Sequence, residues 1–479
     1  MLKTYLILFY SIISLIFFTS CEVSRRDQTP FTELCNHIMG PEFESRDFGI
    51  KAMHKTRETL ERFLAMPHTM LDVQAKTSLM DCLELYKNVI NHLNLSKKHT
   101  NAADVRRWLI AAVVNHQTCL NGFKHSNLLR LFEDMLVELE ASNSHSPTIH
   151  NHGFVQLSEG CAIQANFVVA QDGSGDFSTV TEAIEAAENQ RRIVTNRLVI
   201  YVKAGIYKEN IYIKNSMTNL MLYGDGIDAT VITNDKNIFD GLLTSNTATV
   251  QVWGQGFVAH GITFENTAGP EKQQAIALLS ASDQSIFYKC SFKGNQDTLC
   301  LLQNRQFLRE CDIYGTIDFI FGDASAVLQN CNIYVRTPLP GTQNTITAQG
   351  RIDPSSNTGF VIENSRVMPA PDSSLVDGLA MTYLGRPWRD YSRVVYIKCD
   401  LDNVINPAGW LPFRGDSAFG KVYYAEYMNT GQSADTGGRI KWPGYHVLTT
   451  EEAEQFSVRL FLTGESWIPE TGVPFSSDI

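Results

Sequence analysis

The chain has 479 residues, of which 44% are hydrophobic and 19% are charged, and its formal net charge at pH 7 is −11. A chain of this length and composition can build a large core in two or three domains, which excludes an intrinsically disordered protein and a membrane protein with many spans. The acidic balance excludes a nucleic-acid partner, which would require a clustered basic face. It also argues against electrostatic capture of a strongly anionic polymer, and it leaves a neutral or partly esterified polymer acceptable.

The first twenty residues have the pattern of a secretory signal peptide. Lys3 precedes an apolar run from Tyr5 to Phe18, which is shorter than the ~20 residues that a membrane span needs. We therefore predict a signal peptide at 1–20 and a secreted, extracellular protein with no membrane segment after its removal. In that compartment the cysteines are candidates for disulfide bonds, and Asn94 in an Asn-Leu-Ser triplet is a candidate glycosylation site.

Residues 21–141 carry the apolar periodicity of amphipathic helices. Apolar side chains recur at helical spacing in three stripes, at 79–93, 105–120 and 128–139. Short polar connections join the stripes, so we predict an antiparallel helical bundle. Cys82 and Cys119 fall on the buried faces of two of these helices, which predicts a disulfide bond between them.

The chain changes character after a polar stretch at 142–160. We interpret that stretch, with His145, His150 and His152, as a solvated linker rather than a metal site. Residues 161–479 consist of short β-branched runs separated by Gly, Asn and Asp, for example at 198–202, 219–223 and 249–252. Such runs predict many short strands.

A cysteine-containing unit recurs in this second half. Cys290, Cys311 and Cys331 lie 21 and 20 residues apart, and Cys399 begins a similar unit. A repeat of that length built from strands predicts a solenoid. Because the leucine framework of leucine-rich repeats is absent, we predict a right-handed parallel β-helix.

The same period places two aspartates on neighbouring turns. Asp297 follows Cys290 by the same seven residues that separate Asp318 from Cys311. In a parallel β-helix the two carboxylates would lie at equivalent positions about 4.8 Å apart and face one groove. By the same count Cys311 and Cys331 lie one above the other, within the ~4.4–6.8 Å Cα spacing of a disulfide, which predicts a second disulfide bond.

Two carboxylates this close cannot both ionise cheaply, so one becomes a proton donor while the other stays anionic as a nucleophile or base. Aspartates also stack in solenoids for structural reasons, so the neighbouring residues decide. Gln296 can offer an amide N–H to an oxyanion, and apolar residues around Asp318 keep water scarce. Arg386 can hold a carboxylate anionic, and Trp388 can stack on a sugar ring.

The longest motifs of the chain resemble the signature segments of the plant pectin methylesterases. In chain order the motifs of the second half are VVAQDGSGDF at 168–177, QAIAL at 274–278, GNQDTL at 294–299, GTIDFIFG at 315–322, NTITAQGR at 344–351 and LGRPW at 384–388. The helical half, with DCLEL at 81–85 and TCLNGF at 118–123, is similar to the inhibitor-like domain that precedes many of these enzymes. The resemblance implies a four-helix inhibitor-like bundle at 21–141 and a pectinesterase β-helix at 161–479.

The resemblance also implies a reaction and a place of action. The chain would hydrolyse methyl esters of pectin galacturonates in the cell wall, giving methanol, with no cofactor or metal. Asp318 would be the nucleophile, Asp297 the acid and then the base, and Gln296 the group that stabilises the oxyanion. The implied substrate-binding residues are Thr244, Gln274, Arg386 and Trp388. The resemblance leaves open whether the inhibitor-like domain acts within the chain or separately.

The chain departs from the family pattern beside the acid. Asn295 and Cys300 stand where the family usually has tyrosine, and Cys300, without an obvious partner, is expected to be a free thiol. Ser365 stands where another cysteine is expected, and the stretch from 142 to 161 has no Lys or Arg for the usual basic cleavage motif. We therefore expect an altered surface for the polymer near Asp297.

Three other functions fit part of the sequence. A pectin glycoside hydrolase also uses paired carboxylates on a β-helix, but only the short motif at 439–441 points to one. A serine esterase lacks its Gly-x-Ser-x-Gly motif here. A wall-binding or inhibitory protein with weak or no catalysis is the third, and methanol release from methylated pectin distinguishes it.

Overall fold

The computed structural model describes residues 54, 57, 61, 73–98, 111, 115, 164–191, 196–373, 382–413, 415 and 418–479. The chain divides into two compact units, residues 1–149 and 150–479. In the first unit, helix α4 (Val73–Lys98) buries Leu79, Cys82, Tyr86 and Val89 along one face, as the periodicity predicts. Cys82 is disulfide-bonded. Its predicted partner Cys119, the helix at 128–139, the signal peptide and the linker at 142–160 lie outside the described residues.

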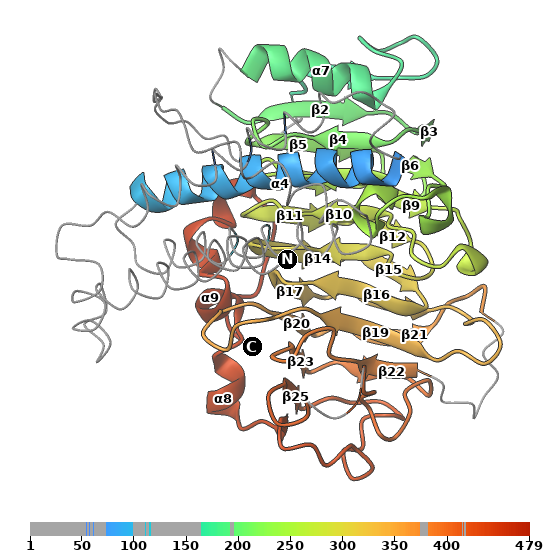
Figure 1. Cartoon of the computed structure of the whole chain (residues 1–479), viewed down its shortest axis with the longest axis vertical. Coiled ribbons are helices and arrows are strands. Elements are labelled where there is room, and N and C mark those ends of the chain that lie inside the picture. The colour runs from blue at the N-terminus through green and yellow to red at the C-terminus, as the bar shows by residue number, and fades with distance from the viewer. Residues whose placement is uncertain are drawn as a thin grey trace, which may run out of the picture. The chain divides into compact units, whose positions relative to one another are not determined.

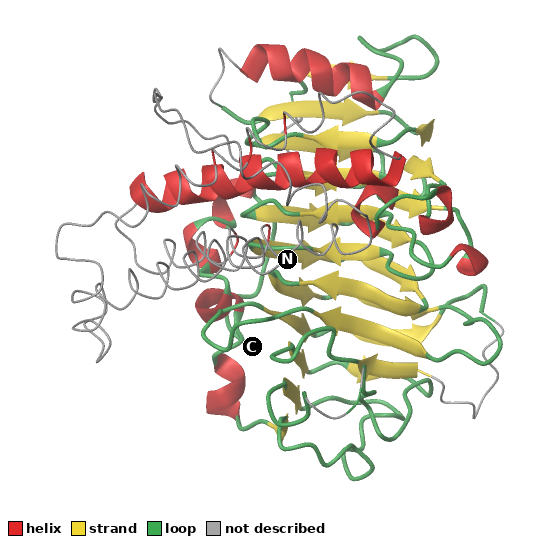
Figure 2. Cartoon of the chain, in the orientation of Figure 1, coloured by secondary structure: helices red, strands yellow, loops and turns green. Residues whose placement is uncertain are grey.

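The second unit is a parallel β-helix in which successive strands visit three sheets in turn (Figures 1 and 2). Every strand pair in these sheets is parallel, as in the pairing of β11 with β14 and of β13 with β16. In spatial order, sheet A contains β1 (Phe167–Val169), β2 (Leu198–Val202), β5 (Leu220–Gly224), β8 (Val258–His260), β11 (Ser285–Tyr288), β14 (Arg305–Arg309), β17 (Ser325–Gln329), β20 (Gly359–Glu363), β23 (Arg393–Ile397), β25 (Tyr423–Tyr427) and β26 (Tyr445–Val447).

Sheet B contains β24 (Asp400–Leu401), β21 (Arg366–Pro369), β18 (Asn332–Val335), β15 (Asp312–Gly315), β12 (Ser291–Lys293), β9 (Thr263–Asn266), β6 (Thr230–Asn234) and β3 (Gly205–Lys208). Sheet C contains β22 (Thr382–Gly385), β19 (Asn344–Gln349), β16 (Ile317–Gly322), β13 (Leu299–Leu301), β10 (Leu278–Ser280), β7 (Val250–Val252) and β4 (Ile211–Ile213). The strands predicted at 198–202, 219–223 and 249–252 are β2, β5 and β7, with shifts of one residue at most.

The recurring cysteine unit is the corner between sheets A and B. At each corner one residue has a left-handed backbone and the next side chain points into the core. The left-handed residues include Lys289 (φ 50°), Glu310 (φ 53°), Asn330 (φ 58°) and Lys398 (φ 51°). The following cysteines at 290, 311, 331 and 399 are at most 1% exposed. A single left-handed residue bends the chain sharply, and a small apolar side chain fits the space inside the bend.

The predicted disulfide between Cys311 and Cys331 is not formed. The two cysteines stack on adjacent turns as the period predicts, but both are free thiols. The thiol of Cys311 donates to the carbonyl oxygen of Phe287 at 3.3 Å, and that of Cys331 lies 3.8 Å from the carbonyl oxygen of Leu308. The spacing therefore correctly predicted that Cys311 and Cys331 lie on adjacent turns, but the disulfide bond inferred from it is absent. Cys300 is also a free thiol, as expected.

Helical segments cover the first turn and the outer face of sheet A. Helix α7 (Val180–Arg191) buries Val180, Ala183 and Ile184 over the first strands, and the Glu209 carboxylate accepts from the backbone N–H of Val180 at its N-terminus. At the other end of the unit, α8 (Thr450–Glu454) and α9 (Val458–Phe461) belong to a segment that packs its apolar side chains on the outside of sheet A. The remaining short 3-10 helices are η2 (Ile238–Asp240), η3 (Thr244–Thr247), η4 (Pro270–Lys272), η5 (Gly464–Ser466) and η6 (Pro469–Thr471).

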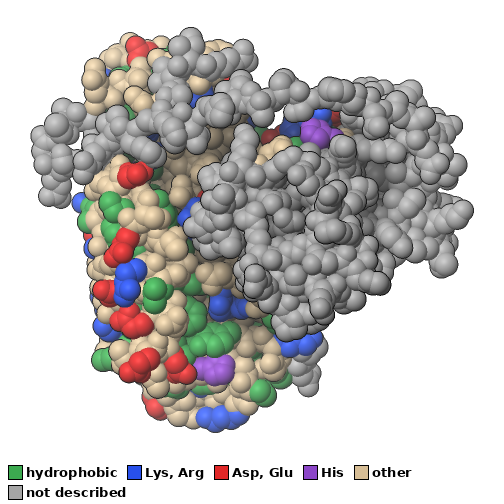
Figure 3. Space-filling view, turned by 90° about the vertical axis from the view of Figure 1, so that its left-hand side faces the viewer, with side chains coloured by type: hydrophobic (Ala, Val, Ile, Leu, Met, Phe, Trp, Pro, Cys, Tyr) green, Lys and Arg blue, Asp and Glu red, His purple; other side chains and the backbone are tan. Residues whose placement is uncertain are grey.

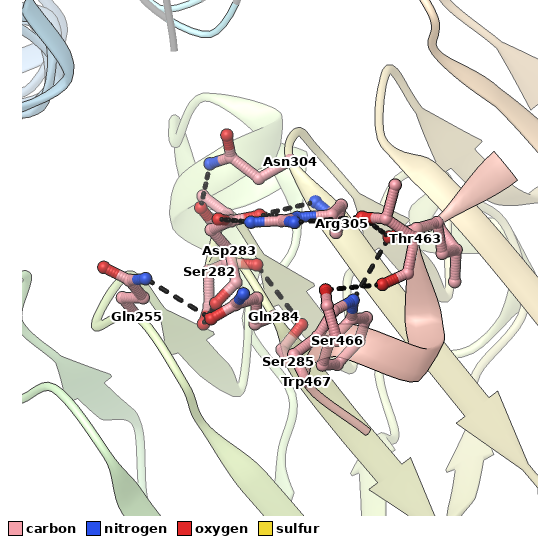
Figure 4. Close-up of polar contacts among 12 residues, drawn as sticks. Gln255, Ser282, Asp283, Gln284, Ser285, Asn304, Arg305, Thr463, Ser466 and Trp467 are labelled. Atoms are coloured by element: carbon pink, nitrogen blue, oxygen red, sulfur yellow. Dashed lines mark hydrogen bonds and ion pairs between the residues drawn. The ribbon is translucent and has the colours of Figure 1, made fainter. Parts of the chain in front are cut away.

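A buried ion pair joins the solenoid to this C-terminal segment. Figure 4 shows Arg305 between Asp283 of the preceding turn and Thr463 of the C-terminal segment. Arg305 donates from Nη2 to Asp283 Oδ2 at 2.7 Å and from Nη1 to Thr463 Oγ1 at 3.3 Å. Both partners of the pair are 5% exposed, so both charges are removed from water and their interaction offsets part of that cost.

The described surface has mixed charge. On the face in Figure 3, acidic and basic side chains lie interspersed over the visible part rather than gathered into one basic area. Among the described residues, the helices are too short or too polar to cross a bilayer.

Candidate active site

The two aspartates lie on adjacent turns where the chain enters sheet C. Asp297 precedes β13, and Asp318 lies near the start of β16. The register pairs Leu299 with Ile320, and the backbone N–H of Asp297 donates to the carbonyl of Ile317 at 3.0 Å. Both aspartates have left-handed backbones, with φ of 62° and 53°. The structure thus places them at equivalent positions, one strand spacing of about 4.8 Å apart along the solenoid.

Asp318 lies in a β-bulge. Ile317 pairs with Thr345 and Ile320 with Thr347, so the register of β16 against β19 shifts between Ile317 and Ile320. An extra residue in one strand turns a side chain away from its regular direction, and bulges are frequent beside active sites for this reason. Here the Asp318 carboxylate at the bulge meets Arg386, which follows β22 two turns farther along the solenoid.

Arg386 binds the Asp318 carboxylate with both arms of its guanidinium. Nε donates to Oδ1 at 2.8 Å and Nη2 donates to Oδ2 at 2.7 Å. Paired, charge-assisted hydrogen bonds of this kind hold a carboxylate anionic and fix its plane. The guanidinium in turn stacks on the ring of Phe413, with Cζ 4.7 Å from the ring centroid.

Asp297 has the opposite electrostatic environment. Its side chain is buried, and burial raises its pKa well above the ordinary value for aspartate; the negative charge of Asp318 raises it further, while the positive charge of Arg386 opposes the rise. Desolvation and a like charge both disfavour the ionised form. Burial and the neighbouring charge thus favour the protonated form of Asp297, while the Asp318 carboxylate is bound by the guanidinium of Arg386.

The predicted amide donors lie beside this pair. Gln274 and Gln296 form a parallel bridge between adjacent turns, and the backbone N–H of Ala275 donates to the carbonyl of Gln296 at 3.2 Å. Both glutamine side chains are half-buried. The Gln274 Oε1 atom is buried and has no hydrogen-bond partner among the described residues. The amide groups are thus placed on the same edge of sheet C as the carboxyl group of Asp297.

Trp388 and Thr244, the remaining predicted substrate-binding residues, lie on other turns of the solenoid than the aspartates. The Trp388 indole packs edge-on against Phe321, three residues beyond Asp318, with ring centroids 6.1 Å apart. Thr244 begins η3, which leads into β7, three turns before Asp318, and its carbonyl accepts from the Thr247 hydroxyl at 2.7 Å. Arg386 binds Asp318 directly, Asp297 interacts with both through charge, and Gln274 and Gln296 bridge the turn of Asp297 to the turn before it.

Sequence reasoning missed two residues that touch this group. The Thr345 hydroxyl binds Asp318, and Phe413 supports Arg386. Thr345 lies inside the conserved-looking motif at 344–351, but the turn between Asp318 and Thr345 takes 27 residues instead of 21. Counting in steps of 21 residues from Asp318 therefore does not arrive at Thr345. No motif contained Phe413.

The expected change beside the acid is also present. Cys300 lies on β13 with its side chain 2% exposed. Burial raises the pKa of its thiol well above the ordinary value, and Asp297 adds to the rise when its carboxyl group is ionised. A buried, protonated thiol is a small apolar group, so it offers the polymer no stacking surface.

A parallel β-helix that holds a carboxylic acid beside an arginine-bound carboxylate has the fold and the site of a polysaccharide-modifying hydrolase. Residues 166–465 match the Pectinesterase family, and residues 19–159 match the Plant invertase/pectin methylesterase inhibitor family. The chain belongs to the pectinesterase family, with an inhibitor-family region before the enzyme.

Curated relatives and solved structures agree with this assignment. Probable pectinesterase/pectinesterase inhibitor 6 of Arabidopsis thaliana is 41% identical over 97% of this chain and 94% of its own length. Pectinesterase 2 of Citrus sinensis is 46% identical over 84% of this chain and 82% of its own. The solved pectin methylesterase from carrot superposes with a TM-score of 0.65 at 48% identity, covering 67% of this chain and all (100%) of that one. The enzyme from Aspergillus niger superposes with a TM-score of 0.54 at 32% identity, covering 65% of this chain and 96% of that one.

The chain is therefore a carboxylic ester hydrolase that demethylesterifies pectin. This activity is favoured over a wall-binding protein without catalysis and over a pectin glycoside hydrolase.

Proposed function

We propose that the methyl ester of a pectin galacturonate is cleaved by Asp318 as nucleophile and Asp297 as acid and base. The observation that carries this assignment is the asymmetry of the pair. Arg386 binds the Asp318 carboxylate at 2.7 and 2.8 Å, while burial and the neighbouring charge raise the pKa of Asp297. An anionic nucleophile next to a protonated acid is the arrangement that acyl transfer needs at its start.

In the first half of the reaction, an oxygen lone pair of Asp318 forms a bond to the ester carbonyl carbon, and the carbonyl π electrons move onto its oxygen. The amide N–H groups of Gln296 and Gln274 stabilise this oxyanion. When the oxyanion collapses, the bond to the methoxy oxygen breaks, and Asp297 gives that oxygen its proton. Methanol leaves, and the galacturonate acyl group is joined to Asp318 as an anhydride.

In the second half, Asp297 is ionised and takes a proton from a water molecule. The water oxygen bonds to the acyl carbon, the bond to Asp318 breaks, and the free galacturonate acid is released. Asp297 is protonated again and Asp318 is again an anion beside Arg386. The residue pair thus returns to its starting state without a cofactor.

The substrate is a chain of sugars, so we propose that groups around the pair hold several of them. The indole of Trp388 is suited to contact a sugar ring, and the hydroxyl of Thr244 is suited to contact a sugar hydroxyl. A related pectin methylesterase, 25% identical, has been solved in complex with a hexasaccharide, which supports an extended binding surface. We also propose secretion of the enzyme to the cell wall, on the basis of the signal-like residues 1–20.

Methanol release from methylated pectin by the purified full chain tests the proposal. Asp318→Ala and Asp297→Ala are each expected to lower kcat by roughly 10²–10⁴-fold or more, because each removes a group that takes part in bond making or proton transfer. Asp400→Ala is the matched control: its ion pair with Arg366 on sheet B is exposed (47% and 54%) and should not affect turnover. Full turnover by either variant of the pair would refute the assignment.

A further inference from the structure

The bulge at Asp318 deprives its backbone of the regular partner. In an even parallel ladder alternate N–H groups of β16 would meet carbonyl groups of β19, but the register shifts between Ile317 and Ile320. The N–H of Asp318 instead donates to the hydroxyl oxygen of Thr345 at 3.0 Å. The same hydroxyl donates its proton to Asp318 Oδ1 at 2.6 Å. The side chain of Thr345 is fully buried, with 0% exposure.

We propose that Thr345 is a positioning residue for the nucleophile, which locks the bulge and the carboxylate of Asp318 in one orientation and selects Oδ2 as the attacking oxygen. This inference rests on the proposed role of Asp318. One hydroxyl holds both ends of the residue, because it accepts from the backbone and donates to the side chain. Neither rotation of the carboxylate nor relaxation of the left-handed backbone is then possible without breaking a buried hydrogen bond.

The choice between the two oxygens follows from their hydrogen bonds. A carboxylate oxygen has two lone-pair directions. Oδ1 uses both, since it accepts from Thr345 Oγ1 at 2.6 Å and from Arg386 Nε at 2.8 Å. Within the described part of the chain, Oδ2 accepts from Arg386 Nη2 alone, at 2.7 Å. Oδ2 therefore keeps one lone pair for the ester carbon, and Thr345 prevents the two oxygens from exchanging places.

Thr345→Val tests the proposal, because it keeps the shape of the side chain and removes the hydroxyl. We expect kcat to fall on the order of ten- to a hundred-fold, which is the range for a hydrogen bond to a charged group. KM should change little, because no substrate contact is lost. The acid limb of the pH profile of kcat/KM should move to higher pH, because the anionic form of Asp318 has lost a donor. Thr345→Ser keeps the hydroxyl and should restore kcat and the acid limb.

The matched control is Thr230→Val. Thr230 is also 0% exposed, accepts from the backbone N–H of Asp225 at 3.0 Å and donates to the carbonyl of Val202 at 3.0 Å. It has the same double role without a catalytic carboxylate. Both variants are checked for a native near-ultraviolet circular dichroism spectrum, and Thr345→Ala is measured in addition, in case valine disturbs the core.

The experiments distinguish an error in the role of Thr345 from an error in the role of Asp318. If Asp318→Ala keeps its activity, Asp318 is not the nucleophile and Thr345 cannot position it, which refutes both proposals. If Asp318→Ala is inactive but folded Thr345→Val has wild-type kcat and an unmoved acid limb, only the positioning role is wrong. Loss of the fold in both hydroxyl-free variants would also contradict it, since the hydroxyl would then serve stability rather than the reaction.

Discussion

At the scale of single residues, two aspartates one turn apart lie in opposite electrostatic environments. The reason lies in the neighbours, since Arg386 contacts Asp318 with two hydrogen bonds and acts on Asp297 only through its charge. Arg386→Lys would retain the charge but lose the planar fork. The difference between the two aspartates therefore depends on a residue two turns beyond Asp318, which the spacing of the aspartates does not reveal.

This coupling can be measured as a shift in the pKa of Asp297. Asp318→Asn removes a negative charge that raises this pKa, and it leaves the opposing charge of Arg386 uncompensated, so both changes act downward. We expect the pKa of Asp297 to fall in this variant, as followed by carbon-13 NMR of labelled carboxyl groups. Arg386→Met is the control with the opposite sign, because it removes the charge that lowers the pKa. An Asp297 titration that is the same in all three proteins would contradict the electrostatic account.

The thiols of the β-helix provide a second prediction at this scale. The five cysteines of the described part of this unit, Cys290, Cys300, Cys311, Cys331 and Cys399, are buried and free. Burial raises the pKa of Cys399 to about 12, and it raises the pKa values of the Cys300 and Cys311 thiols well above their usual range. Because the thiolate is the reactive form, iodoacetamide at neutral pH should leave all five unmodified in the folded protein.

Denaturation without a reductant should then expose all five thiols to the same reagent, as counted by peptide mass spectrometry. Modification of Cys311 and Cys331 only after reduction would show that the disulfide expected from their spacing does form. Cys82, which is disulfide-bonded, is the internal control that requires reduction.

At the scale of elements, the C-terminal segment depends on a buried charge pair. Asp283→Asn would remove the negative charge that the Arg305 guanidinium, 5% exposed, binds at 2.7 Å. Breaking a buried pair by removing one partner costs about 3–5 kcal/mol of unfolding free energy. The matched surface change, Asp400→Asn, breaks an exposed pair with Arg366 and should cost less than about 1 kcal/mol. Urea unfolding of the two variants measures the difference, and equal losses would mean that the buried pair has no special role.

At this scale the structure also shows which elements could be predicted from the sequence and which could not. The cysteine period predicted the parallel stacking of turns and the juxtaposition of Asp297 and Asp318, because one turn after another repeats the same local rule. It did not predict the bulge at Asp318, which breaks that rule, or the contact with Thr345 across a turn of a different length. Helix α7 was also missed, since only strands were expected after residue 161. Periodicity thus fails at irregular positions, and Asp318, the proposed nucleophile, occupies one of them.

At the scale of the whole molecule, the solenoid is stabilised by the apolar interior of many similar turns. A buried carboxyl group is an exception to this interior, and its ionisation can affect the stability of the fold. Asp323 follows β16 and is 4% exposed. Its Oδ1 accepts from Gln349 Nε2 at 3.0 Å and from the hydroxyl of Thr358 on the next turn. The carboxyl group thus joins consecutive turns close to the active site, and its protonation affects the fold in which the site is held.

The stability of the enzyme should therefore depend on pH through Asp323. Burial raises the pKa of its carboxyl group to about 7, against the opposing effect of its hydrogen bonds and of Arg351 and Arg393. For an acid whose pKa is higher in the folded state than the ~4 of the unfolded chain, the stabilising contribution is present below pH ~4 and is lost as pH rises through the folded value. The loss of stabilising free energy is at most about 1.4 kcal/mol per pH unit over that window.

Asp323→Asn does not titrate, so its melting temperature should fall less between pH 5 and pH 8 than that of the wild type. Asp435→Asn, on the exposed surface, should follow the wild type, and parallel melting curves for all three proteins would show that Asp323 does not control this dependence.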